Sequence, residues 1–493
     1  MTSNPLIKNA LKGLAIIISL FFIVIFFNTL RNNSHQLTIN AIQSPDIAPQ
    51  SIVNTLAQAI RFQTVSQRNL ATIDYTQYVA FRNYLQKTFP IVYQTLTYET
   101  VNEHSLLFTW QGQDSSLPPI LFAAHYDVVS ADSNTINKWT HPPFSGTISD
   151  GFIWGRGAMD DKAAIITQLF AIQSLIQQNF QPKRTLLFAY GHDEEIGGEQ
   201  GATKISELLA SRDYRPEWLI DEGMPITHGV LQGIENPVAL IAIAEKGYLT
   251  LKLQVMGDGG HSSSPPPHSA VGILAQAITR LEANPLPAHL SGPVGEMFNT
   301  LAPEMRWPQR AVLSNRWLFS SILEKQLSAK HSTNAMIRTT TAATMFEGSS
   351  QANVLPTQAT ARVNFRLLPG DTTDEVIHHV QTVINDAQVH ITQEGNAIKP
   401  SSVSSIRSEG FRAITTTVRE IFPDTLTAPT LLIASTDSRH YASLVNNTYR
   451  FRPLQVTPED IKRFHGVNER IAHDNLLTMT QFQIRLIQNI NGY

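Results

Sequence analysis

The chain has 493 residues, 42% of them hydrophobic, and this length is enough for two or three domains with separate cores. Its formal net charge of −3 offers no basic surface for nucleic acid, so we expect no nucleic-acid partner. It contains no cysteine, which excludes disulfides, thiol catalysis and cysteine-ligated zinc. Any metal ion must therefore be bound by histidine, aspartate or glutamate.

An apolar, uncharged stretch, GLAIIISLFFIVIFFNTL at residues 13–30, lies near the N-terminus. It is close to the length that spans a bilayer and longer than the apolar core of a typical signal peptide. Lys8 and Lys12 precede it, which favours a cytoplasmic N-terminus. We expect residues 1–12 to be cytoplasmic, the stretch to be a single-pass transmembrane signal anchor, and the catalytic domain to lie on the non-cytoplasmic side, periplasmic, extracellular or lumenal. A cleaved signal peptide and a buried helix are the alternatives.

A polar linker is expected at residues 31–49, and after it apolar strands alternate with helical patterns, as in PPILFAAHYDVV, DDKAAIITQLFAIQSLIQQ and RTLLFAYGHDEE. This alternation predicts an α/β catalytic domain with a mostly parallel twisted sheet and helices on both faces. Residues 244–366 interrupt it with strand patterns around a helix, which predicts a smaller inserted α+β domain. The catalytic domain would then consist of residues 50–243 and 367–493.

Acidic and histidine clusters follow the predicted strands repeatedly. They are His125 and Asp127 in AAHYDVV, Asp160 in GAMDDK, Glu194 and Glu195 in GHDEEIGG, Asp221 in LIDEG, and His465 in FHGVNERI. Functional groups of open α/β sheets gather at the carboxyl ends of strands, so these side chains are expected to meet. Zinc accepts imidazole nitrogen and carboxylate oxygen, and a two-metal site accounts for the whole set, with one histidine for each metal and a bridging aspartate.

The order of HYD, GRGAMDDK, DEE, DEG and a late histidine resembles the co-catalytic zinc hydrolases, which include aminoacylases, carnosinase-like dipeptidases, glutamate carboxypeptidases and carboxypeptidase S. GHDEEIGGEQGA and FHGVNERI look closest to the branch of carboxypeptidase S and the N-acyl-amino-acid hydrolases. The resemblance implies two Zn²⁺ ions, with Co²⁺ or Mn²⁺ as alternatives. It makes the ligands His125, Asp160, Glu195, Asp221 and His465. It makes Asp127 the residue that orients His125, and Glu194 the general base and acid.

In this family the inserted domain is a lid and dimerisation domain, so the resemblance implies a homodimer formed through it. His261 resembles the histidine that helps to hold the substrate carbonyl oxygen, often across a dimer. Asn353 in ANVLP and Arg366 in NFRLLPGD resemble groups that bind the substrate carboxylate. Each has a structural alternative, because His261 can satisfy a loop backbone, Asn353 can hold a turn and Arg366 can pair with a surface acid.

The expected function is hydrolysis of an amide or peptide bond next to a free carboxylate, in a small peptide or an N-acyl amino acid. A serine hydrolase is disfavoured, because the sequence contains no G-x-S-x-G. An aminopeptidase with the same two-metal site is the nearest alternative. A catalytically dead, membrane-tethered binding protein is a further one, although it is expected to have lost ligands, and all five positions keep them.

Overall fold

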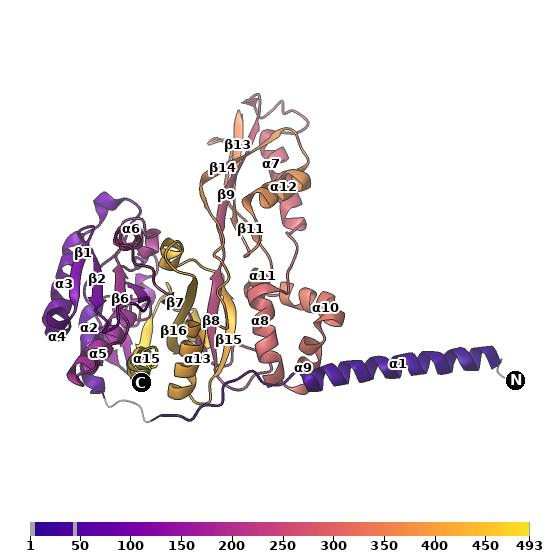
Figure 1. The fold of residues 1–493 in the computed structure, drawn as a ribbon. Coiled ribbons are helices and arrows are strands. Elements are labelled where there is room, and N and C mark those ends of the chain that lie inside the picture. The colour runs from indigo at the N-terminus through magenta and orange to yellow at the C-terminus, as the bar shows by residue number, and fades with distance from the viewer. Residues whose placement is uncertain (1–4, 43–46, 493) are drawn as a thin grey trace.

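The computed structural model describes residues 5–42 and 47–492, and its largest element is an eight-stranded sheet of order β1-β2-β6-β3-β7-β16-β8-β15 (Figure 1). The strands of this sheet are β1 (Thr97–Val101), β2 (Ser105–Trp110), β6 (Leu186–Gly191), β3 (Ile120–His125), β7 (Trp218–Thr227), β16 (Asn447–Val456), β8 (Val238–Glu245) and β15 (Leu426–Leu432). The four central strands, β6, β3, β7 and β16, run parallel. Their carboxyl ends therefore meet at one edge of the sheet.

The α/β class is as predicted, but the sheet is mixed rather than mostly parallel. β2 is antiparallel to both β1 and β6, and β8 is antiparallel to its neighbours β7 and β16. The connection from β1 to β2 at residues 102–104 and the connection from β7 to β8 at residues 228–237 are short. Since parallel strands need a long crossover, these connections impose antiparallel pairing.

Helices cover both faces of the large sheet. The helices over one face are α2 (Pro49–Ile60), α5 (Lys162–Gln177), α13 (Glu409–Ile421) and α15 (His473–Asn489). Between α2 and α5 in the chain, α3 (Tyr75–Thr88) and α4 (Pro90–Thr95) extend this layer. The other face is covered by α6 (Ala202–Ser211) and the 3₁₀ helix η5 (Asp437–Tyr441). Strand alternation explains the division, because Phe122 of β3 belongs to the first core and its neighbour Leu121 to the second.

A smaller unit rises from the large sheet (Figure 1). Its antiparallel sheet has the order β11 (Thr340–Glu347), β13 (Gln358–Arg366), β9 (Tyr248–Met256) and β14 (Val389–Ile398). The helices α7 (Ala270–Ala283) and α12 (Thr373–Ile384) share its core. Because β14 pairs with β9, the unit continues past Arg366, where the sequence suggested its end, to Ile398. A short pair, β10 (Gly260–His261) and β12 (Val354–Leu355), extends from it.

Four α-helices within residues 292–337 form an insert that packs on the large sheet rather than on the small one. They are α8 (Gly292–Leu301), α9 (Trp307–Ser314), α10 (Arg316–Ser328) and α11 (His331–Ile337). Leu301, Leu313 and Leu323 of this insert share a core with Leu240 of β8 and Leu431 of β15. The insert is therefore part of the unit built on the large sheet, which we call the catalytic body because the sequence predicts the active site there, although the sequence placed the insert within the small domain.

The N-terminal helix α1 (Pro5–Arg31) projects from the body (Figure 1). Its residues Leu11–Arg31 are long and apolar enough to cross a membrane, with a mean hydropathy of 2.5, and a signal sequence would have the same properties. Gln36 and Leu37, which follow α1, contact the body. The Gln36 side chain bonds to the Thr427 backbone, and Arg419 Nε donates to the Leu37 carbonyl oxygen.

Candidate metal centre

The acidic and histidine clusters come together at the carboxyl edge of the four parallel strands. His125 is the last residue of β3, and Glu194 and Glu195 begin the 3₁₀ helix η3 (Glu194–Ile196) just after β6. Asp160 lies in the loop before α5, and His465 lies in the loop after the short helix α14 (Pro458–Ile461). A small sheet of β4 (Thr147–Ser149), β5 (Phe152–Trp154) and β17 (Arg470–Ala472) brings these two loops side by side.

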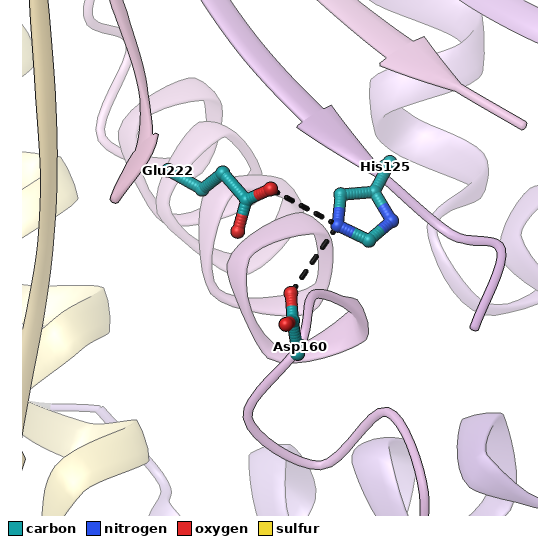
Figure 2. A group of neighbouring side chains, drawn as sticks. All are labelled: His125, Asp160 and Glu222. Carbon is teal, nitrogen blue, oxygen red and sulfur yellow. Dashed lines mark hydrogen bonds and ion pairs between the residues drawn. The ribbon is translucent and has the colours of Figure 1, made fainter. Parts of the chain in front are cut away.

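Two of these side chains, His125 and Asp160, form a first group together with Glu222 of β7. His125 Nε2 lies 3.3 Å from Asp160 Oδ1 and 3.3 Å from Glu222 Oε1 (Figure 2). His125 is almost fully buried, whereas both carboxylates are slightly exposed. The three side chains point toward a common centre, and their ligand atoms lie within 4.8 Å of one another.

The second group shares Asp160 with the first. His465 Nε2 lies 3.1 Å from Asp160 Oδ2 and 3.1 Å from Glu195 Oε2. Asp160 therefore presents one carboxylate oxygen to each imidazole, which is the arrangement of a carboxylate that bridges two metal ions. The side chain of His465 is 53% exposed, so the centre opens to solvent on this side.

The donor set fits a pair of divalent cations. Three carboxylates and two imidazoles converge in a small volume, and this combination of oxygen and nitrogen donors suits zinc and neighbouring divalent metals. The buried Glu195 Oε1 has no hydrogen-bond partner among the described residues, although a buried carboxylate oxygen is normally paired. A cation beside it would remove that deficit.

Glu222, and not Asp221, lies beside His125. Side chains alternate along β7, so Ile220 belongs to the core of one face and Leu219 to the core of the other. Glu222 shares the face of Ile220, whereas the Asp221 carboxylate accepts hydrogen bonds from the backbone N–H of Glu222 and from that of Ser438 in η5, both at 2.8 Å. The metal-ligand role suggested for Asp221 therefore fits the position of Glu222 instead.

An irregularity in β7 supports this placement. Asp221 pairs with Arg450 of β16, but the next pair is Met224 with Phe451, so Glu222 and Gly223 lie in a bulge. Gly223 has a φ of +147°, and a Cβ at this position would lie 2.7 Å from Arg450 Cβ. Bulges commonly re-aim a side chain beside a functional site. The sequence DEG shows two carboxylates but not which of them faces the centre.

Asp127 connects the two parts of the centre. One of its carboxylate oxygens lies 3.3 Å from His125 Nδ1, and the carboxylate accepts the backbone N–H groups of Glu194 and Glu195, each at 3.1 Å. Asp127 therefore fixes the ring of His125 and the turn that carries the two glutamates. It is fully buried, as expected for a residue that positions a ligand without contacting the metal.

A buried ion pair holds the loops of Asp160 and His465 together. Arg156 Nη1 lies 2.6 Å from Glu469 Oε2, and Arg156 Nη2 donates to the carbonyl oxygen of His465 at 3.0 Å. Glu469 Oε1 accepts the backbone N–H of Met159 at 2.8 Å and that of Asp160 at 3.2 Å. This pair joins segments about 300 residues apart in sequence, and sequence motifs alone did not single it out.

The charges of the centre perturb its titrating groups. Burial, and then the negative charge of Glu222, raises the pKa of the Glu194 carboxyl well above its usual range. Burial raises the pKa of Glu195 to about 7. Hydrogen bonds that His465 donates to Asp160 and Glu195 raise the pKa of its imidazole to about 10. For His125, burial opposes the charged form, but Glu222, Asp127 and Asp160 outweigh it and raise the pKa well above its usual value.

Arginines near the centre were missed in the sequence. Arg452 of β16 lies 3.3 Å from Asp160 and 2.9 Å from Asp161, and it also contacts Glu222. Arg439 of η5 donates to the Gly197 carbonyl oxygen at 2.7 Å, next to the turn of the two glutamates. Only the pairing of β16 with β7 and the position of η5 bring these residues here, so a linear motif could not reveal them.

The three residues expected to bind substrate belong to the small unit and not to the edge of the large sheet where the centre lies. His261 and Asn353 are exposed on the small unit, where His261 Nδ1 is 2.8 Å from Ser263 Oγ and the Asn353 carbonyl oxygen accepts the Ser262 N–H. Arg366, at the end of β13, donates to Ser435 Oγ at 3.3 Å and stacks on the Tyr248 ring. Arg366 therefore lies where the small unit joins the catalytic body, near η5.

Comparisons with known proteins agree with this architecture. Residues 121–489 match the model of peptidase family M20/M25/M40. The chain is 40% identical to probable carboxypeptidase S-like 2 of Dictyostelium discoideum, over all of this chain and 96% of that protein. It is 41% identical to the N-fatty-acyl-amino acid synthase/hydrolase PM20D1 of Xenopus tropicalis, over 89% of this chain and 86% of that protein.

Among solved structures, the M20 family metallo-carboxypeptidase Sso-CP2 from Sulfolobus solfataricus shares the fold with a TM-score of 0.63 and 19% identity, over 89% of this chain and 98% of that one. Fold and relatives together define a hydrolytic enzyme of the metallopeptidase class. More particularly, the chain belongs to peptidase family M20/M25/M40. The family resemblance predicted from the five motifs is confirmed.

Proposed function

We propose that the protein hydrolyses an amide or peptide bond next to a free carboxylate, using two divalent cations, expected to be zinc. The observation that carries this proposal is Asp160, whose two carboxylate oxygens each face a different imidazole. His125, Asp160 and Glu222 would hold one ion, and Asp160, Glu195 and His465 the other. Co²⁺ and Mn²⁺ accept the same donors and are alternatives.

The chain supplies the proton transfer. Two bound cations would activate a water molecule and polarise the carbonyl group of the scissile amide. Glu194, held at the edge of the cluster by its N–H bond to Asp127, would accept the proton from the water and return it to the nitrogen of the leaving amine. The raised pKa of its carboxyl suits a group that must both take and give a proton.

Recognition of the substrate involves the small unit. An arginine fork matches a carboxylate, so Arg366 would bind the free carboxylate beside the scissile bond, with Asn353 as a second contact. His261 would stabilise the negative charge that develops on the carbonyl oxygen. Since His261 and Asn353 lie away from the centre, they would act after the small unit closes, or across a homodimer.

The substrate class follows the relatives. One is named for carboxypeptidase activity and another for N-fatty-acyl amino acids, and both kinds of substrate carry a free carboxylate next to an amide. We propose small peptides and N-acyl amino acids as substrates. An aminopeptidase with the same cluster is the second candidate, and a binding protein without activity is disfavoured by the complete donor set.

The helix α1 completes the proposal. By length and composition it can cross a bilayer as a single span. With lysines before it, its N-terminal end would stay in the cytoplasm and the catalytic body would lie on the other side.

The test is a product profile of the full chain in detergent, with added zinc. N-acyl amino acids and dipeptides with a free C-terminal carboxylate should be cleaved, and their C-terminal amides should not. A matched peptide with a blocked N-terminus and a free C-terminus separates the candidates, because an aminopeptidase leaves it intact. If the enzyme cleaves peptides with a free N-terminus and their C-terminal amides, but leaves N-terminally blocked substrates intact, the proposal is contradicted.

A further inference from the structure

The helix α1 is not a free tether, because its C-terminal turns dock on the corner formed by α9 and α10. The buried face of α1 is narrow: Ile25 and Thr29 are buried, and Asn28 and Asn32 are half-buried. These four residues follow the spacing of one helix face. The helices α9 and α10 meet at Asn315, which is fully buried. We call these two helices the α9–α10 corner.

Polar contacts make the docking specific. Asn315 Nδ2 donates to the carbonyl oxygen of Ile25 at 3.2 Å and to Thr29 Oγ1 at 3.3 Å, and Asn28 donates back to Asn315 Oδ1 at 3.0 Å. Arg310 donates to the carbonyl oxygens of Thr29 and Asn32, at 3.2 Å and 2.7 Å. The Thr29 carbonyl belongs to the last turn of α1, and Asn32 directly follows the helix, so Arg310 lies at the helix end where a cation is favourable. Hydrogen bonds from side chains across packed helices are typical of association within membranes.

The corner also exposes large apolar side chains beside α1. Trp317 is 62% exposed and lies with its ring centroid 6.3 Å from that of Phe21, and Trp307 is 52% exposed and lies 6.2 Å from Phe26. Ile322 of α10 is also 62% exposed. Large apolar side chains exposed beside an apolar helix are costly in water and are accommodated by lipid.

An apolar groove runs between α1 and the corner. Its volume is about 520 Å³, and every residue that lines it is apolar. Phe22 and Phe26 of α1, Trp307 and Pro308 of α9, and Phe319 of α10 contribute to it. A groove that is open and lacks polar groups suits a hydrocarbon chain rather than a peptide, whose backbone would need hydrogen-bond partners.

The depth of these side chains follows from the helix rise of 1.5 Å per residue. If Arg31 marks the membrane surface, Phe26 lies about 8 Å and Phe21 about 15 Å inside it. About 15 Å is half of the hydrocarbon thickness of a bilayer. Trp307 and Trp317, which contact these phenylalanines, therefore fall within the leaflet on the side of the catalytic body.

We infer that the α9–α10 corner is embedded in this leaflet together with α1, and that the groove holds an acyl chain of a bilayer lipid. The inference rests on the proposal that α1 crosses a membrane. Leu313 and Leu323 of the corner belong to the same core as β8 and β15 of the catalytic sheet. The catalytic body is thereby held at the bilayer in one fixed orientation.

The test uses the absence of cysteine, which makes a single introduced thiol a unique labelling position. Full chains carrying Trp317→Cys, Ile322→Cys, Ile17→Cys or Val79→Cys are labelled with a nitroxide and reconstituted into phosphatidylcholine vesicles. Ile17 is an exposed residue of α1 and reports whether that helix is in the bilayer. Val79 is an exposed apolar residue of α3, on the far side of the body in Figure 1, and serves as the matched control.

The inference predicts that the labels at positions 317, 322 and 17 collide more often with oxygen, which concentrates in lipid, than with a water-soluble nickel chelate. The label at position 79 should collide more often with the nickel chelate. If the labels at 317 and 322 are accessible to nickel while the label at 17 is in lipid, the inference is overturned, but the proposal that α1 crosses the membrane still holds. A water-accessible label at 17 would overturn both. Labels shielded from both reagents and broadened by spin–spin contact would show a second copy on this face, which also overturns the inference.

Discussion

The cluster at the carboxyl edge of the large sheet is held by buried contacts on several sides, whereas His261 and Asn353 lie on an exposed strand pair of the small unit. Asp127 and the Arg156–Glu469 pair hold the cluster through buried hydrogen bonds within the chain. The expected substrate groups have no comparable contacts with it. Under the proposed function, metal binding would be built into one rigid body, while substrate recognition would depend on movement of the small unit or on a partner subunit.

The largest effect is expected at Glu194 in the rigid part. Glu194→Gln should keep both metal ions and still bind substrate, yet lower kcat by about 10²–10⁴-fold, the usual contribution of a positioned proton-transfer group. Zinc content and kcat measured on the same preparation check this. Glu199→Gln, an exposed position in the same loop, is the matched control and should change neither quantity. A variant at Glu194 that lost a metal ion would make this residue a ligand instead.

The next test separates the two neighbouring carboxylates of β7. Glu222→Gln should weaken one metal site by about 100-fold or more and lower activity in a way that added zinc partly restores, because it removes a direct ligand. Asp221→Asn should leave metal affinity nearly unchanged, since Asp221 bonds to the backbone N–H of Ser438 in η5. Titration with a competing chelator measures both affinities, and the opposite ranking would return the ligand role to Asp221.

A smaller effect is expected where the small unit joins the body. Arg366→Ala should lower kcat/KM by about 10–100-fold, mainly through KM, because a charged hydrogen-bond pair with the substrate carboxylate contributes about 1.5–3 kcal/mol. Arg362→Ala is the control on the same strand, because Arg362 pairs with the surface residues Glu347 and Glu394. If both variants behave alike on N-acyl amino acids, Arg366 does not bind the carboxylate.

The smallest effect concerns stability at the same junction. Burial, and then the charge of Arg366, lowers the pKa of Lys246 to about 7, whereas a lysine in the unfolded chain has a pKa of about 10.4. Between these pH values the unfolded chain binds more protons than the folded one, so stability rises with pH across this window. The urea midpoint should therefore increase from pH 7 to pH 9.5 more for the native chain than for Lys246→Met. The control Lys252→Met, on β9, should keep the native slope, and equal slopes for all three chains would contradict the assignment.

Much of this architecture is visible in the sequence because local patterns specify it. The strand ending at His125 and the helix over residues 162–177 follow from hydropathy, and the family follows from the order of the motifs. Three features required the fold. The choice of Glu222 over Asp221 depends on strand alternation and a bulge, the pairing of β14 with β9 is non-local, and the packing of the helical insert on β15 has no local signal.

The central claim is that two cations sit on either side of Asp160, and anomalous diffraction from crystals of the zinc-loaded full chain tests it most directly. The account predicts two anomalous peaks per chain, about 3.5–4 Å apart. One should be bound by His125, Asp160 and Glu222, and the other by Asp160, Glu195 and His465. A single peak, or a pair of peaks that does not share Asp160, would contradict it.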